Sequence, residues 1–217
     1  MWIADLWRST VGKKIVMAVT GLIMIGFLIT HVAANLLAFA GPARINAYSA
    51  FLHSAGELLW VARAVLVLSV VLHVIAAVQL TATDRAARPV GYTRQEFRAA
   101  TLASRTMRWG GLVLLVFLVY HLLHMTVGTV HPSFTPHDPY QNVVTGLVVP
   151  WVAAFYVVAM VALGLHLFHG TWSAFRTLGV QPPSGDPLRR RAVTAFAVLV
   201  AGGFAAIPIA VYFGFIH

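Results

Sequence analysis

Cysteine is absent from this chain of 217 residues. That absence excludes disulfides, thiolate nucleophiles and CxxC metal sites, and it excludes any iron-sulfur cluster bound by the chain's own side chains. If the protein carries electrons, histidine is the side chain left to hold the carrier. The sequence contains ten histidines but only six aspartates and glutamates.

Charged residues are also scarce. They make up 10% of the chain, whereas hydrophobic residues make up 59%. A soluble domain is closer to half apolar and a quarter charged, so this composition indicates an integral membrane protein. The formal charge of +9 does not indicate a nucleic-acid partner, because in a membrane chain the location of the charges carries the information.

Five apolar runs are long enough to be helices that cross a bilayer, which requires about 20 residues. They cover residues 15–39, 61–83, 109–130, 143–172 and 192–215. We therefore expect an all-α integral membrane protein in which residues 1–217 form one transmembrane domain of five helices.

Basic residues indicate the orientation. Thirteen of the fifteen lysines and arginines fall in the N-terminal segment and in the connections assigned to the same face, and only Arg44 and Arg63 fall on the other face. The positive-inside rule then predicts a cytoplasmic N-terminus, an external His217 and a multi-pass protein of the cytoplasmic, or inner, cell membrane. The basic segments 84–108 and 189–191 would face an acidic soluble partner or anionic lipid headgroups.

The connection between the third and fourth spans, residues 130–142, is rich in proline and polar residues. His131, His137 and Asp138 lie in it, but two prolines separate the histidines and leave no recognisable metal-ligand spacing. We expect a plain external loop.

Four spans carry a histidine at a depth that can be calculated from the helical rise and the bordering cytoplasmic charge. His31 lies 17 residues, roughly 25 Å, from Lys14, and His121 lies 13 residues, roughly 20 Å, from Arg108. His73 lies 12 residues, roughly 18 Å, from Arg85, and His166 lies 10 residues, roughly 15 Å, from Arg176. His31 and His121 thus form an outer pair, and His73 and His166 an inner pair. Depth alone does not separate His121 from His124, or His166 from His169.

Each pair comes from two different helices, which is how a helical bundle clamps a flat cofactor between axial ligands. Two haems with two histidine ligands each, at two depths, would carry electrons across the membrane, and filled axial positions suit electron transfer. The alternatives from a different class are a haem-free anchor or a channel whose histidines relay protons.

Several strings give the chain a resemblance to a family. GFLITHVAANL contains His31 and Asn35, LHVIAAVQL contains His73, YHLLH contains His121, and HLFHGTWSAFRTLG contains His166; INAYSAFLHSAGELLWVARAVL joins the first two spans. Together they resemble the cytochrome b membrane anchor of succinate dehydrogenase and fumarate reductase, in its single-chain form with five helices and two haems. The most specific string is HxxHG leading into WSxFxxxG.

The resemblance implies two b haems, with His31 and His121 as axial ligands of the distal haem and His73 and His166 as those of the proximal haem. Succinate oxidation would lie on a flavoprotein subunit, and an iron-sulfur subunit would deliver electrons on the cytoplasmic side. The quinone, menaquinone or ubiquinone, would be the substrate of the membrane part of this respiratory, tricarboxylic-acid-cycle enzyme. The partners would be these two subunits, the lipid membrane and quinone. The complex could assemble into a higher oligomer, and no nucleic acid is expected to bind.

A quinone site needs titratable or hydrogen-bonding groups near a haem, and haem propionates need basic partners. The residues expected to make such contacts are Asn35, Arg44, Tyr48, His53, Glu57 and Arg63, with Arg105 as a further propionate partner.

The alternative within the cytochromes is the membrane cytochrome b of a different respiratory dehydrogenase, whose partners would lie mainly on the outer face.

One departure from the family bears on the direction of the reaction. Some fumarate reductases of this type have a membrane glutamate just before the histidine of the fourth span, where this chain has Gly164 and Leu165. No aspartate or glutamate lies inside any predicted span, which favours a succinate oxidiser.

Overall fold

The computed structural model describes residues 5, 7–87, 101–180 and 187–217. These residues form helices and turns without a β-strand. The helices are α2 (Thr10–Leu36), the 3-10 turn η1 (Leu37–Ala40), α3 (Pro42–Ser54), α4 (Glu57–Ala86), α5 (Leu102–Leu122), the π-helical turn η2 (Leu123–Val127), α6 (Pro139–Leu147), α7 (Pro150–Thr177) and α8 (Pro187–Tyr212).

Five helical stretches in the described part of the chain are long and apolar enough to span a membrane. They are Thr10–Ala40, Glu57–Ala86, Leu102–Val127, Pro150–Thr177 and Pro187–Tyr212. The expectation of five membrane helices is therefore confirmed. The basic segment 84–108 is only partly visible, since residues 88–100 lie outside the described residues.

One of the predicted spans differs from the helices in the structure. The fourth apolar run, predicted as one span from residue 143, is divided into α6 and α7. Val149 between them is extended (φ −73°, ψ 117°) because a proline at position 150 disfavours the helical conformation of the residue before it. The connection between the first two spans contains α3, which begins at Pro42 directly after Gly41 (φ 90°).

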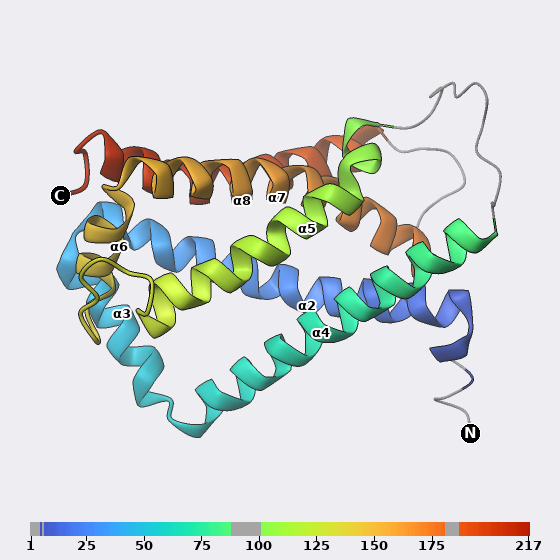
Figure 1. Ribbon diagram of the computed structural model, residues 1–217, viewed down its shortest axis with the longest axis horizontal. Helices are drawn as coiled ribbons and strands as arrows, with labels where there is room; N and C mark the ends of the chain where they lie inside the picture. Colours follow the sequence, from blue (N-terminus) through green and yellow to red (C-terminus); the bar gives the residue numbers. More distant parts are fainter. Residues whose placement is uncertain (1–4, 6, 88–100, 181–186) are drawn as a thin grey trace.

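The bundle places α7 and α8 side by side, with α5 against α7 and α2 against both α7 and α8 (Figure 1). The interface of α7 and α8 is lined by small and aliphatic residues, including Ala159, Leu163, Ala197 and Val200. Small side chains at such a position let membrane helices approach closely. The helix of the second span, α4, packs chiefly against α2.

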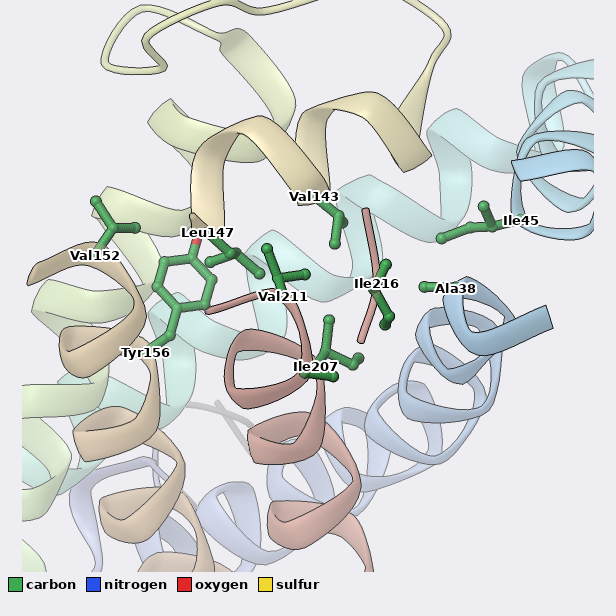
Figure 2. Packing of buried hydrophobic residues seen from close by; sticks show 10 residues of the cluster. Ala38, Ile45, Val143, Leu147, Val152, Tyr156, Ile207, Val211 and Ile216 are labelled. Carbon is green, nitrogen blue, oxygen red and sulfur yellow. The ribbon is translucent and has the colours of Figure 1, made fainter. Parts of the chain in front are cut away.

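A second apolar cluster closes the bundle at the end opposite the N-terminus (Figures 1 and 2). There the ends of α2, α7 and α8 meet α3 and α6, and the C-terminus lies beside them. The buried members are Ala38, Ile45, Val143, Leu147, Val152, Tyr156, Ile207, Ala210, Val211 and Ile216. We call this region the α3/α6 end. It fixes the positions of the two short helices over the long ones.

Candidate functional site

The rings of His31 on α2 and His121 on α5 face each other. Their centres are 6.0 Å apart and their planes are inclined by 79°. Phe27 stacks on His31 at 4.9 Å, and Phe117 stacks on His121 at 5.5 Å. Each phenylalanine lies one turn before its histidine, so the ring of each histidine is supported by its own helix.

A second pair of rings lies between α4 and α7. His73 and His166 have ring centres 6.3 Å apart and planes inclined by 54°. These are the two pairs that the depth calculation predicted, and in each pair the two histidines come from different helices. It is His166, rather than His169, that makes the ring contact with His73.

The Nδ1 ring nitrogen of His73 is held by Thr20 on α2. The hydroxyl of Thr20 donates to the carbonyl oxygen of Val16 at 2.7 Å, and its oxygen lies 3.2 Å from Nδ1 of His73. Because the hydroxyl proton is already used, the oxygen accepts the Nδ1–H of the imidazole. The lone pair of His73 is then on Nε2.

His31 has a neighbour on its own helix. The amide nitrogen of Asn35 lies 3.3 Å from Nδ1 of His31 and donates to the carbonyl oxygen of His31 at 2.8 Å. Asn35, a member of the expected set of quinone and propionate contacts, therefore touches a histidine of the outer pair.

His121 and His124, which sequence reasoning left unresolved, have different surroundings. Both contact the hydroxyl of Tyr156 through Nδ1, at 3.2 Å for His121 and 2.9 Å for His124. His124 is fully buried and lies between the rings of Tyr120, at 5.3 Å, and His131, at 4.7 Å. Such a sandwich leaves no room for a flat cofactor, whereas the ring of His121 is turned toward His31.

His131 belongs to this packed group as a structural residue. Its Nδ1 accepts from the backbone N–H of Ser133 at 3.1 Å, and its Nε2 donates to the carbonyl oxygen of Asn142 at 2.9 Å. Gly146 lies directly against the stack, since a Cβ there would be 2.7 Å from Nε2 of His131. The stack of His124 and His131 thus joins η2 to α6.

The remaining expected contact residues lie on α3 and the first turns of α4. Arg44, Tyr48 and His53 are on α3, and Glu57 and Arg63 are on α4. The guanidinium of Arg63 lies over the ring of Trp60 at 4.8 Å. The ring of His53 contacts that of His137 at 5.5 Å, so it points to the 130–142 connection. Arg105 lies in the first turn of α5.

A hollow of about 490 Å³ runs along one face of α4. It is lined by Trp60, Arg63, Ala64, Val67, Leu68 and Val71. The lining is apolar except for Arg63, so a guest in this hollow would meet one cation among hydrocarbon side chains.

Sequence reasoning missed Thr20 and Tyr156. Both are single polar residues in long apolar runs, and such residues frequently serve only to bond one helix to another. The signal that was available for Tyr156 is its depth, because it lies 10 residues before His166 on the same helix, which is about 15 Å. Counted as above, Tyr156 is 20 residues or about 30 Å from Arg176, so its depth is nearer to that of the outer pair than to that of the inner pair.

Groups of three or more histidine, aspartate or glutamate side chains suited to a metal ion are absent from the described residues. The two histidine pairs are therefore the arrangement to be explained. Each presents two imidazoles across a space between helices, inside a membrane bundle.

Comparison with known proteins identifies one family. The model of the succinate dehydrogenase/fumarate reductase transmembrane subunit matches residues 84–206, which contain His121 and His166 and begin after His31 and His73. No curated protein and no solved structure matches the chain. The matched region covers more than half of the 217 residues. The chain therefore belongs to the succinate dehydrogenase/fumarate reductase transmembrane subunit family.

Proposed function

We propose that this chain is the dihaem cytochrome b anchor of a succinate:quinone oxidoreductase. It passes electrons from the iron-sulfur subunit, by way of the inner and then the outer histidine pair, to a membrane quinone. A b haem held by two histidines supplies one-electron transfer without binding a substrate at the iron. Succinate oxidation itself belongs to the soluble subunits.

The observation that carries the proposal is the spacing of the two pairs. An iron bonded to two imidazole nitrogens at about 2 Å each holds the ring centres roughly 6 Å apart. The separations of 6.0 Å for His31 and His121 and 6.3 Å for His73 and His166 agree with that requirement. A porphyrin supplies four further nitrogens, so the iron needs only the two protein ligands that each pair provides.

The hydrogen bonds of the imidazoles support the same assignment. A histidine that binds a metal usually gives its other ring N–H to an oxygen acceptor, which fixes the tautomer and the direction of the ring. Thr20 does this for His73, and Tyr156 is placed to do it for His121. In both cases Nε2 is the nitrogen left for the iron.

The loose packing of α4 also fits a bulky cofactor. Because α4 packs chiefly on α2, apolar side chains of α4 such as Val67, Leu68 and Val71 stay exposed. The hollow along α4 presents Arg63 among apolar residues, which suits a macrocycle edge with an acidic propionate. We assign Arg63 on α4, and Asn35 beside His31 on α2, to the outer haem or to its quinone.

The distribution of charge supports the proposed direction of electron flow. With the basic N-terminal end in the cytoplasm, the α3/α6 end is external and the inner pair lies nearer to the soluble subunits. Arg85, Arg108, Arg176 and the arginines at 189–191 stand at that cytoplasmic end. Gly164 and Leu165 stand just before His166, where some fumarate reductases have a carboxylate, and the absence of that carboxylate favours succinate oxidation.

The experiment is a dithionite-reduced minus oxidised visible spectrum of the purified protein with a haem count per chain. We expect two b haems in the parent, with His31→Ala and His73→Ala each removing a different one. His169→Ala is the matched control and should retain both. A parent without haem would contradict the cytochrome and leave a haem-free anchor, and a haem lost in the control would contradict the ligand assignment.

A further inference from the structure

Two exposed histidines meet at the α3/α6 end, away from both pairs described above. The ring of His53 on α3 lies 5.5 Å from the ring of His137, centre to centre, and the planes are inclined by 79°. The two residues are 84 positions apart in the sequence, and both side chains are exposed. Their contact therefore depends on how α3 and the 130–142 connection are folded together.

The tautomer of His53 is set by its own helix. Nδ1 of His53 lies 2.8 Å from the carbonyl oxygen of Ser49. A carbonyl can only accept, so Nδ1 carries the proton and Nε2 carries the lone pair. This is the arrangement usual for a histidine that binds a metal, in which an oxygen acceptor orients the ring and raises its basicity.

The partner histidine is held in place by a neighbouring attachment. The side chain of Asn46, two turns before His53 on α3, donates to Asp138 at 2.9 Å and accepts from the backbone N–H of Tyr140 at 3.1 Å. These bonds fix residues 138–140 to α3 directly after His137. The pair is consequently preorganised, which a ligand site requires.

We propose that His53 and His137 bind one divalent transition-metal cation of the zinc, copper and nickel class. Imidazole nitrogens suit these ions, whereas calcium and magnesium require oxygen ligands. A ring separation of 5.5 Å falls within the roughly 5–6 Å expected for two imidazoles on one ion, from tetrahedral to opposite ligand positions. Exposure to solvent leaves the other coordination positions for water, so this is an ion site and not a third haem site.

A bound ion would fasten the 130–142 connection to α3. Both segments cover the α3/α6 end, so the ion would stabilise that end of the folded bundle by binding the folded state alone. Asp138 already accepts from Asn46 and from the backbone N–H of Gln141 through Oδ1. The histidines are therefore the residues whose removal tests the site.

The test is calorimetric titration with ZnCl₂ on the full chain, purified with its associated subunits and without an affinity tag. We expect one zinc ion per chain in the parent. Loss of a mere orienting partner lowers metal affinity by about 10–100-fold, so His53→Ala and His137→Ala should each lower it at least as much. His217→Ala removes an exposed histidine outside the pair and should leave the titration unchanged.

Electron paramagnetic resonance of the Cu²⁺-loaded protein provides a second readout. We expect hyperfine coupling to two imidazole nitrogens in the parent and to one in each single variant. An unchanged circular dichroism spectrum and melting temperature of the metal-free variants would show that both are folded. The proposal is overturned if the parent binds no zinc or if the two variants bind it as tightly as the parent does. It does not depend on the histidine pairs inside the membrane.

Discussion

The hydroxyl of Tyr156 bridges His121 and His124, at 3.2 Å from Nδ1 of the first and 2.9 Å from Nδ1 of the second. A hydroxyl has one proton to donate, so it gives it to one ring and accepts from the other. If His121 binds iron through Nε2, its Nδ1 must carry a proton, and Tyr156 then accepts from His121 and donates to His124. The ligand and its neighbour thus share one oriented chain.

These two hydrogen bonds of Tyr156 predict the effect of Tyr156→Phe. With His121 as a ligand of the proposed outer haem, removing the acceptor weakens the basicity of the imidazole, which favours reduced iron and raises the midpoint potential of that haem. A hydrogen bond worth about 0.5–1.5 kcal/mol corresponds to roughly 20–60 mV for one electron. Potentiometric titration of the visible spectrum measures the shift, and the potential of the inner haem should stay constant.

Tyr140→Phe is the control for that measurement. Its hydroxyl donates to the carbonyl oxygen of His217 at the surface of the α3/α6 end, so its removal should move neither potential. If Tyr156→Phe leaves the outer potential unchanged, or lowers it, Tyr156 does not orient the ligand. If Tyr140→Phe raises the outer potential equally, the shift has a general structural cause.

Thr20 makes the corresponding prediction for the inner pair. Thr20→Val keeps the branched shape and removes the oxygen that accepts from His73. We expect the proposed inner haem to be lost about 10–100-fold more readily, measured as the rate of haem transfer to an excess of an acceptor apoprotein. Thr20→Ser keeps the oxygen and should behave as the parent does. Equal haem loss in the two variants would mean that the hydroxyl plays no part.

The spans and the pairing of the histidines were accessible from the sequence because both depend on local rules. Apolar length determines a membrane helix, and a constant rise converts residue number into depth. The choice between His121 and His124 depends on how α5 is rotated and on the change to a π-helical turn at Leu123. Neither property has a signature in YHLLH, so only the packing of His124 between Tyr120 and His131 separates them.

The predicted helix boundary was wrong where a single residue determines it. The apolar run from residue 143 is continuous in composition, yet Pro150 separates α6 from α7. The contact of His53 with His137 was equally inaccessible, since a pair 84 residues apart follows only from the course of the chain. These two residues lie outside the predicted spans, so no helical depth could be used to match them.

Gly146 permits the stack of His124 and His131, and this predicts the effect of Gly146→Ala. A Cβ at this position would lie 2.7 Å from Nε2 of His131 and 2.8 Å from Cε1 of His124. Both rings are buried and cannot move away freely, so we expect a loss of about 1–3 kcal/mol from overpacking. A lower melting temperature in detergent measures it. An unchanged melting temperature would mean that the stack is loose.

Gly202 and Gly203 on α8 are adjacent and form a matched pair for the final prediction. A Cβ on Gly203 would lie 2.9 Å from Cγ2 of Val32, whereas a Cβ on Gly202 would meet no atom within 4 Å. Val32 follows His31 on α2, so Gly203→Ala should push α8 away from α2 beside the outer pair. We expect overpacking to lower stability by about 1–3 kcal/mol, together with a changed outer-haem spectrum. Gly202→Ala should leave both measurements at the parent value or raise stability slightly; identical behaviour of the two variants would show that α2 and α8 are not in close contact there.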